Sequence, residues 1–120
     1  MYTPWPFQYL INHRAVDILQ PDINWVGGLT ACRKICEMAD PAGLTVILHG
    51  GGLTQYGLHL TAAMPNMPWA EYFIASPPGV PLAEARGHGA TLPEDGYLRP
   101  NAGPGFGLGL EEEWLKPFWE

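Results

Sequence analysis

Residues 44–52 read Leu-Thr-Val-Ile-Leu-His-Gly-Gly-Gly, and this stretch decides the fold. Its first five residues form a short apolar run with β-branched side chains, which predicts a buried strand over 44–48. The run stops at His49 and three glycines. An earlier run of the same kind, Ala-Val-Asp-Ile-Leu-Gln at 15–20, ends at Pro21 and predicts another strand.

The intervals between the predicted strands show the apolar periodicity of helices. Apolar side chains recur at helical spacing over residues 29–39 and again over 53–64. A third short strand is predicted over 69–74, and residues 5–12 are compatible with a helix that precedes the first strand. Strands and helices that alternate in this order predict an α/β fold with parallel strands. Strands that are apolar throughout are typical of sheets covered by helices.

The composition changes after Ser76. The chain has 120 residues, including 15 Gly and 13 Pro, and these two residue types follow one another closely in the C-terminal third. We therefore predict an α/β part over 1–75 and an irregular, Pro- and Gly-rich segment over 76–120. Length alone favours one small domain, and 47% hydrophobic residues are enough for one core.

Charge and apolar runs exclude several classes of function. Six basic and twelve acidic residues give a net charge of -6, which argues against a nucleic-acid partner. No apolar run approaches the roughly 18 residues of a membrane span, and no signal peptide is visible. Cys32 and Cys36 have the spacing of neither a zinc site nor a disulfide framework. We expect a cytoplasmic protein, with no membrane partner, whose reduced cysteines pack in the core.

Three ionisable residues lie at the predicted strands. Asp22 follows the first strand, His49 follows the second, and Glu71 lies in the third. The carboxyl ends of parallel strands meet at one edge of a sheet, so these side chains can converge. A His beside an Asp can act as a general base, because the carboxylate fixes its tautomer. A nearby Glu can supply a proton or a hydrogen bond, and Trp25 is close enough to line a pocket.

Simpler interpretations stay open for the same residues. Asp22 after a proline is also typical of a turn, and a single His after a strand is often a loop residue. Glu71 is harder to explain in this way, because an unpaired buried carboxylate is costly. His49 and its glycines resemble the oxyanion loop of lipases, which need a nucleophilic serine in a Gly-x-Ser-x-Gly turn. Ser76, the one serine, has no such surroundings.

Five motifs resemble those of the enolase superfamily, and within it the mandelate racemase group of acid-sugar dehydratases. They are Asp-Ile-Leu-Gln-Pro-Asp at 17–22, Gly-Gly-Leu-Thr at 27–30, Leu-His-Gly at 48–50, Pro-Trp-Ala-Glu-Tyr-Phe at 68–73 and Pro-Gly-Phe-Gly at 104–107. The resemblance covers most of the chain in the family's order, and L-rhamnonate dehydratases are the most similar members. The glycines at 50–52 depart from the residues that usually follow the family's histidine.

This resemblance implies a modified TIM barrel of seven βα units and a final strand. The three predicted strands would be the sixth, seventh and eighth, and the segment over 76–120 would pack on the barrel or on a capping domain. A TIM barrel needs roughly 250 residues. A chain of 120 residues is therefore expected to be a C-terminal fragment, with part of the barrel absent.

The resemblance also implies a reaction. His49 would abstract the proton next to a substrate carboxylate, Asp22 would orient the imidazole, and Glu71 would hydrogen-bond the enediolate. Loss of the β-hydroxyl as water would then give a 2-keto-3-deoxy sugar acid. Mg²⁺ is the expected cofactor, held by carboxylates upstream of this chain, so the fragment alone is expected to be inactive. The complete enzyme is expected to be a homo-oligomer.

Two alternative functions stay open. A racemase or cycloisomerase of the same superfamily would share the proton-abstraction step, and only substrate screening would separate it from a dehydratase. A non-catalytic remnant is the other alternative. Three strands without their barrel neighbours leave an open edge and an uncovered apolar face, which favour self-association.

Overall fold

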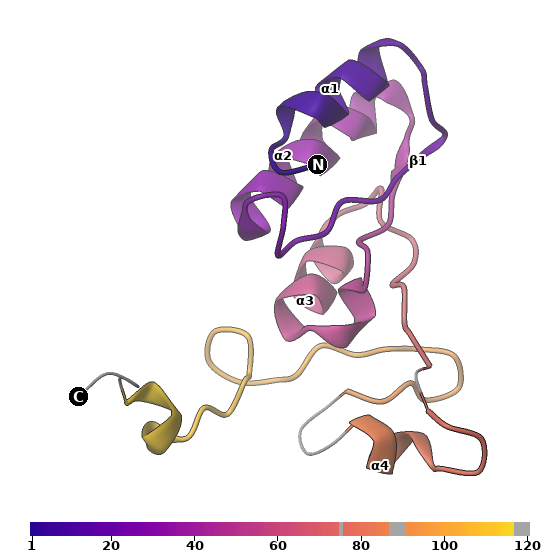
Figure 1. Cartoon of the computed structure of the whole chain (residues 1–120). Helices are drawn as coiled ribbons and strands as arrows, with labels where there is room; N and C mark the ends of the chain where they lie inside the picture. Colours follow the sequence, from indigo (N-terminus) through magenta and orange to yellow (C-terminus); the bar gives the residue numbers. More distant parts are fainter. Residues whose placement is uncertain (75, 87–90, 117–120) are drawn as a thin grey trace.

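The N-terminal part of the chain alternates helices and strands, and the C-terminal part is largely irregular (Figure 1). The structure is a computed structural model that describes residues 1–74, 76–86 and 91–116. The elements of the first part are α1 (Trp5–Asn12), β1 (Ile18–Leu19), α2 (Gly28–Ala39), η1 (Asp40–Ala42), β2 (Thr45–Val46), η2 (Gly51–Leu53) and α3 (Gln55–Ala63). Two short helices follow, α4 (Leu82–Arg86) and η3 (Glu112–Leu115). None of the described helices is long and apolar enough to span a membrane.

β1 and β2 form a parallel pair with Leu19 opposite Val46. The ladder continues past these short strands, because Ile47 N–H donates to Leu19 O at 2.9 Å and His49 N–H donates to Pro21 O at 3.0 Å. Parallel strands require a crossover connection, which α2 supplies. The two strands lie inside the predicted ranges and are shorter than predicted. Their hydrogen bonding brings both strand ends to one edge.

The helices lie close to their predicted positions. Residues 5–12 form α1, and α2 begins one residue before its predicted start. Helix α3 begins two residues late, because residues 51–53 form a separate 3₁₀ turn. Thr54 then caps α3, since its Oγ1 accepts a hydrogen bond from Gly57 N–H at 3.2 Å.

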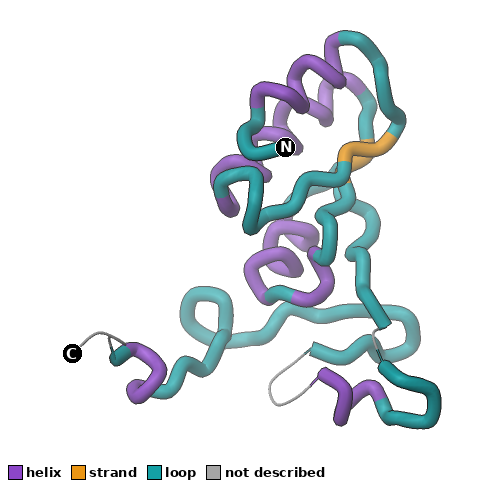
Figure 2. Tube along the Cα trace, viewed as in Figure 1, coloured by secondary structure: helices purple, strands orange, loops and turns teal. Residues whose placement is uncertain are grey.

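The strand predicted over 69–74 is wrong. Among the described residues, the only regular sheet is the pair of β1 and β2 (Figure 2). Two backbone hydrogen bonds connect this part of the chain to β2 and to the glycines after it. Val46 N–H donates to Asn66 O, and Gly52 N–H donates to Glu71 O. Between those two bonds lies Pro68, which has no N–H to donate to a ladder. The predicted burial is also absent: Trp69, Phe73 and Ile74 are exposed.

The hydrophobic core lies between α1, α2 and the two strands. Its best-buried members are Leu19, Val26, Cys32, Ile35, Cys36, Val46 and Leu48. Cys32 and Cys36 are free thiols on the inner face of α2, and Cys36 Sγ lies 3.5 Å from Met67 Sδ. The prediction that both cysteines pack in the core is confirmed.

We expect the two thiols to react slowly in the folded chain. Burial raises the pKa of Cys32 and of Cys36 from 9.0 to about 12, and the nearby Cys36 and Asp22 add to the shift at Cys32. A raised pKa lowers the fraction of reactive thiolate at pH 8. Alkylation by iodoacetamide at pH 8 should therefore be slower than in urea by roughly 100-fold or more. Equal rates in the two conditions would contradict the burial.

The same pKa shifts predict how stability depends on pH. Cys32 and Cys36 hold their protons more tightly in the folded state than in the unfolded state. Their contribution to the free energy of unfolding is therefore complete below pH 9 and is lost as the pH rises toward 12. Urea denaturation at pH 8 and pH 10.5 measures this loss. Serine at both positions should reduce the difference between the two pH values.

The irregular segment after residue 76 docks on α3 through Gln55. Gln55 is buried; its Nε2 donates to Thr91 Oγ1, and its Oε1 accepts from Asn101 N–H at 2.7 Å. The Phe106 ring lies edge-on to the His59 ring at 5.5 Å. In this segment the described residues form two short helices, α4 and η3, and the rest of the described backbone is irregular. Residues 87–90 and 117–120 of the predicted segment lie outside the described residues.

We expect Gln55→Met to loosen this docked segment. Methionine keeps the length of the side chain but removes both hydrogen bonds, which leaves the Asn101 N–H without its partner at a cost of about 1–3 kcal/mol. Chymotrypsin should then cut after the exposed Tyr97 several-fold faster. Gln8→Met, at an exposed position of α1, is the matched control. Identical cleavage of the two variants would show that Gln55 does not hold the segment.

Candidate active site

Glu71 and His49 meet where the two strands end. His49 Nδ1 lies 3.2 Å from Glu71 Oε2, and Gly50 N–H donates to the same oxygen at 2.6 Å. The other oxygen, Oε1, accepts from Gln20 Nε2 at 2.8 Å. Both oxygens of Glu71 therefore have nitrogen partners, which matches the acceptor-only hydrogen bonding of an ionised carboxylate. The His49 side chain is 50% exposed and the Glu71 side chain 27%.

The glycines after His49 allow this close arrangement. Gly50 has a φ of +61°, in the left-handed region that favours glycine. A Cβ at Gly51 would lie 2.6 Å from the Leu48 Cβ, and one at Gly52 would lie 2.7 Å from the Glu71 carbonyl oxygen. The three glycines therefore form a tight turn that brings the backbone of Glu71 next to the end of β2.

Asp22 lies at the same edge, but its hydrogen bond is to its own turn. Its Oδ1 accepts a hydrogen bond from Asn24 N–H at 2.8 Å, as in a tight turn. Within the part of the chain that the structure describes, no hydrogen bond or ion pair joins Asp22 to His49. The expected contact between Asp22 and the imidazole is absent, because Asp22 bonds locally and Glu71 occupies the position beside Nδ1.

Asp22 and His49 line one cavity of about 460 Å³. Gln20 and Trp25 line it as well, so the prediction that Trp25 borders a pocket is confirmed. Met1 and Phe7 complete the lining. Small-molecule sites have volumes of roughly 300–1,000 Å³ and combine apolar walls with a few polar groups. A small polar ligand can therefore reach His49 in this cavity.

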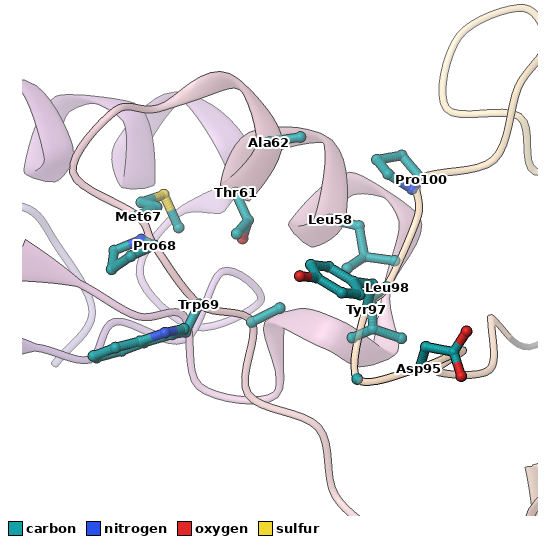
Figure 3. A pocket seen from close by; sticks show the side chains of 12 residues that line it. Leu58, Thr61, Ala62, Met67, Pro68, Trp69, Asp95, Tyr97, Leu98 and Pro100 are labelled. Carbon is teal, nitrogen blue, oxygen red and sulfur yellow. The ribbon is translucent and has the colours of Figure 1, made fainter.

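A larger cavity of about 640 Å³ lies elsewhere, between α3, residues 67–70 and residues 95–100 (Figure 3). Its walls are largely apolar side chains, among them Leu58, Met67 and Leu98. Asp95 is the one carboxylate in its lining, and no histidine lines it. The smaller cavity combines a histidine with a carboxylate, His49 with Asp22, and is therefore the better candidate for an active site.

The described residues do not fit the Mg²⁺ that the family resemblance implies. No group of three or more His, Cys, Asp or Glu side chains in the described ranges could hold a metal ion. Both oxygens of Glu71 accept from nitrogen donors, and Asp22 is bonded to Asn24. Mg²⁺ requires a nearly octahedral set of oxygen ligands, which this arrangement does not supply.

Gln20 is a site residue that the sequence patterns did not single out. It binds Glu71 and lines the cavity beside His49. The signal was present in the sequence, because Gln20 lies two residues before Asp22. Side chains two residues apart along a strand point to the same face.

Known proteins match this chain over almost its whole length. Residues 1–114 match the family described as Enolase C-terminal domain-like. A protein of Caldivirga maquilingensis, named "Putative L-rhamnonate dehydratase", is 36% identical over 116 residues. The match covers 93% of this chain and 29% of that protein. The chain thus spans less than a third of this relative's length.

Two solved structures each resemble more than half of the chain. L-rhamnonate dehydratase from Gibberella zeae is 37% identical, with a TM-score of 0.55 over 59% of this chain and 18% of that one. L-talarate dehydratase from Polaromonas sp. JS666, in complex with Mg and L-glucarate, is 40% identical, with a TM-score of 0.55 over 61% of this chain and 20% of that one. The resemblance to the enolase superfamily is therefore confirmed, and the chain belongs to the Enolase C-terminal domain-like family, whose fold is of the α/β barrel type.

Proposed function

We propose that this chain supplies the proton-transfer residues of a sugar-acid dehydratase that acts on L-rhamnonate or a similar acid. The observation that carries the proposal is the contact between His49 and Glu71 beside the cavity that Asp22 also lines. Relatives named as L-rhamnonate and L-talarate dehydratases support the substrate class. The substrate would lie with its carboxylate end near His49.

In this proposal His49 abstracts the proton next to the substrate carboxylate. A neutral imidazole that donates from Nδ1 to Glu71 carries its lone pair on Nε2, which takes the proton. The charge of Glu71 stabilises the imidazolium that forms. The same imidazolium can return the proton to the β-hydroxyl, so that the C–O bond breaks and water leaves. The enol product then becomes the 2-keto-3-deoxy acid.

The geometry favours a division of roles that differs from the one the resemblance implies. Glu71 contacts the imidazole at 3.2 Å and would fix its tautomer, a role that the family pattern gives to Asp22. Asp22 borders the same cavity and would add negative charge near the imidazolium. Both assignments are part of the proposal.

We propose that the metal ion of the complete enzyme is held by carboxylates outside this chain. A divalent ion would neutralise the charge that develops on the substrate carboxylate, and no step above depends on residues of this chain binding it. The isolated 120-residue chain is then expected to turn over no L-rhamnonate in the presence of Mg²⁺. Measurable turnover by that chain would overturn this part of the proposal. We further propose that the complete enzyme is a homo-oligomer.

The proposed activity can be tested by restoring a full-length barrel. Residues 1–114 would replace the matching C-terminal residues of the Caldivirga relative, and the folded chimera would be assayed with Mg²⁺ on several sugar acids. We expect dehydration, with L-rhamnonate preferred, detected as the 2-keto-3-deoxy acid. Epimerisation without loss of water would favour a racemase. No turnover by a chimera that folds and binds Mg²⁺ would count against the proposal.

A second candidate function is self-association without catalysis. Several large apolar side chains are exposed, among them Trp5, Trp25, Trp69 and Ile74. Such a surface favours association. If this is the function, light scattering on the purified chain should show dimers or larger species that dissociate on dilution. A monomer over the whole concentration range would contradict this candidate.

A further inference from the structure

We propose that Gln20 is a positioning residue that holds the Glu71 carboxylate against His49. The inference rests on the proposed function, because it concerns the same pair of side chains. Its basis is the hydrogen bond of 2.8 Å from Gln20 Nε2 to Glu71 Oε1, which joins the end of β1 to a segment far along the chain.

Glu71 needs such support because no sheet ladder holds its segment. In the described structure, residues 69–74 form no strand, and Phe73 and Ile74, two and three residues after Glu71, are exposed. The backbone of Glu71 is fixed through its carbonyl oxygen, which accepts from Gly52 N–H at 2.8 Å. That bond leaves the side-chain torsions of Glu71 free to rotate, so the position of the carboxylate depends on side-chain contacts.

Gln20 also holds the orientation of the carboxylate plane relative to His49. It binds Oε1, whereas His49 Nδ1 and Gly50 N–H approach Oε2. The last torsion of a glutamate side chain is broad, so a carboxylate without Gln20 can turn away from the imidazole. With Gln20 in place, the plane of the carboxylate is fixed from the β1 side and Oε2 points to Nδ1.

The position of Gln20 makes the role testable without damage to the core. Its side chain is exposed and lines the cavity, and it is not part of the hydrophobic core. A methionine keeps the length of the side chain and removes the hydrogen bond. A glutamate of the same shape places a second carboxylate beside Oε1 and repels Glu71.

The experiment compares Gln20→Met, Gln20→Glu and the wild-type 120-residue chain by NMR, with Gln8→Met as the matched control on exposed α1. Two signals report the arrangement directly: the nuclear Overhauser effect between the His49 ring and the Glu71 side chain, and the chemical shift of the Gly50 amide proton. In Gln20→Met we expect the nuclear Overhauser effect to weaken and the Gly50 amide proton signal to move upfield. Both changes should be larger in Gln20→Glu. The melting temperature is measured in parallel and should change little, because no core contact is lost.

Wild-type signals in both Gln20 variants would overturn the inference. Equal changes in Gln8→Met would do the same, since they would show a general loosening rather than a positioning effect. None of these signals requires turnover. An inactive chimera would therefore count only against the proposed dehydratase activity. Unchanged NMR signals would count only against the positioning role of Gln20.

Discussion

His49→Asn should reduce the kcat of sugar-acid dehydration by about 10²–10⁴-fold, the usual contribution of general acid–base catalysis. The variant would be made in the chimera that joins residues 1–114 to the upstream part of the Caldivirga relative. Asparagine keeps a polar side chain at this partly exposed position but can neither take nor return a proton. Folding should therefore be retained while the chemical step is lost.

His13→Asn is the control for this prediction. His13 is exposed at the end of α1, where its ring stacks on Tyr9 at 4.0 Å, and it does not line the cavity beside His49. Its replacement should leave kcat within a factor of two or so of the wild type, consistent with a surface substitution. Full dehydration activity in His49→Asn would remove His49 from the mechanism.

Gly52→Ala should both destabilise the chain and separate Glu71 from His49. The new Cβ would lie 2.7 Å from the Glu71 carbonyl oxygen and 2.8 Å from Leu98 Cδ1. Leucine can move, but the carbonyl belongs to the backbone that Gly52 N–H binds at 2.8 Å. We expect a loss of about 1–3 kcal/mol in the free energy of unfolding, as for overpacked sites. Urea denaturation and the His49–Glu71 nuclear Overhauser effect measure the two consequences.

Gly79→Ala separates the steric effect from the effect of adding a side chain to a glycine. Gly79 has a φ of +84° and open space where a Cβ would be, so alanine there costs only local backbone strain. The His49–Glu71 contact should survive in that variant. A surviving contact in Gly52→Ala as well would show that the glycine turn does not set the position of Glu71.

Local patterns in the sequence were sufficient for the helices and for the parallel pair of strands. Helix α1 occupies the predicted residues, and α2 buries Cys32, Ile35 and Cys36 on one face, as their helical spacing predicts. Short apolar runs marked β1 and β2, whose Leu19 and Val46 are buried in the core, although Ile18 of β1 is exposed. The family resemblance was also readable from local patterns, since its motifs are short and contiguous.

The residues over 69–74 were not sufficient to decide whether a third strand forms. The apolar run over 69–74 looks like β2 in composition, yet it forms no ladder and leaves Trp69 and Ile74 exposed. A strand exists only if neighbouring backbone groups accept and donate its hydrogen bonds, and these neighbours lie elsewhere in the chain. The docking of the irregular segment through Gln55 depends in the same way on contacts with distant residues, Thr91 and Asn101.

The sequence by itself predicted that Asp22 and His49 lie at one edge of an α/β unit, because the ends of β1 and β2 follow from local periodicity. Glu71 reaches the same edge from a segment that forms no strand, which the sequence patterns did not indicate. Only the tertiary structure decided which of them touch. His49 pairs with Glu71 because the glycine turn brings that backbone close and Gln20 binds the other carboxylate oxygen, while Asp22 bonds to its own turn. Differences of a few tenths of an ångström between segments far apart in sequence decide which groups form hydrogen bonds. Spacing along the chain does not encode these differences.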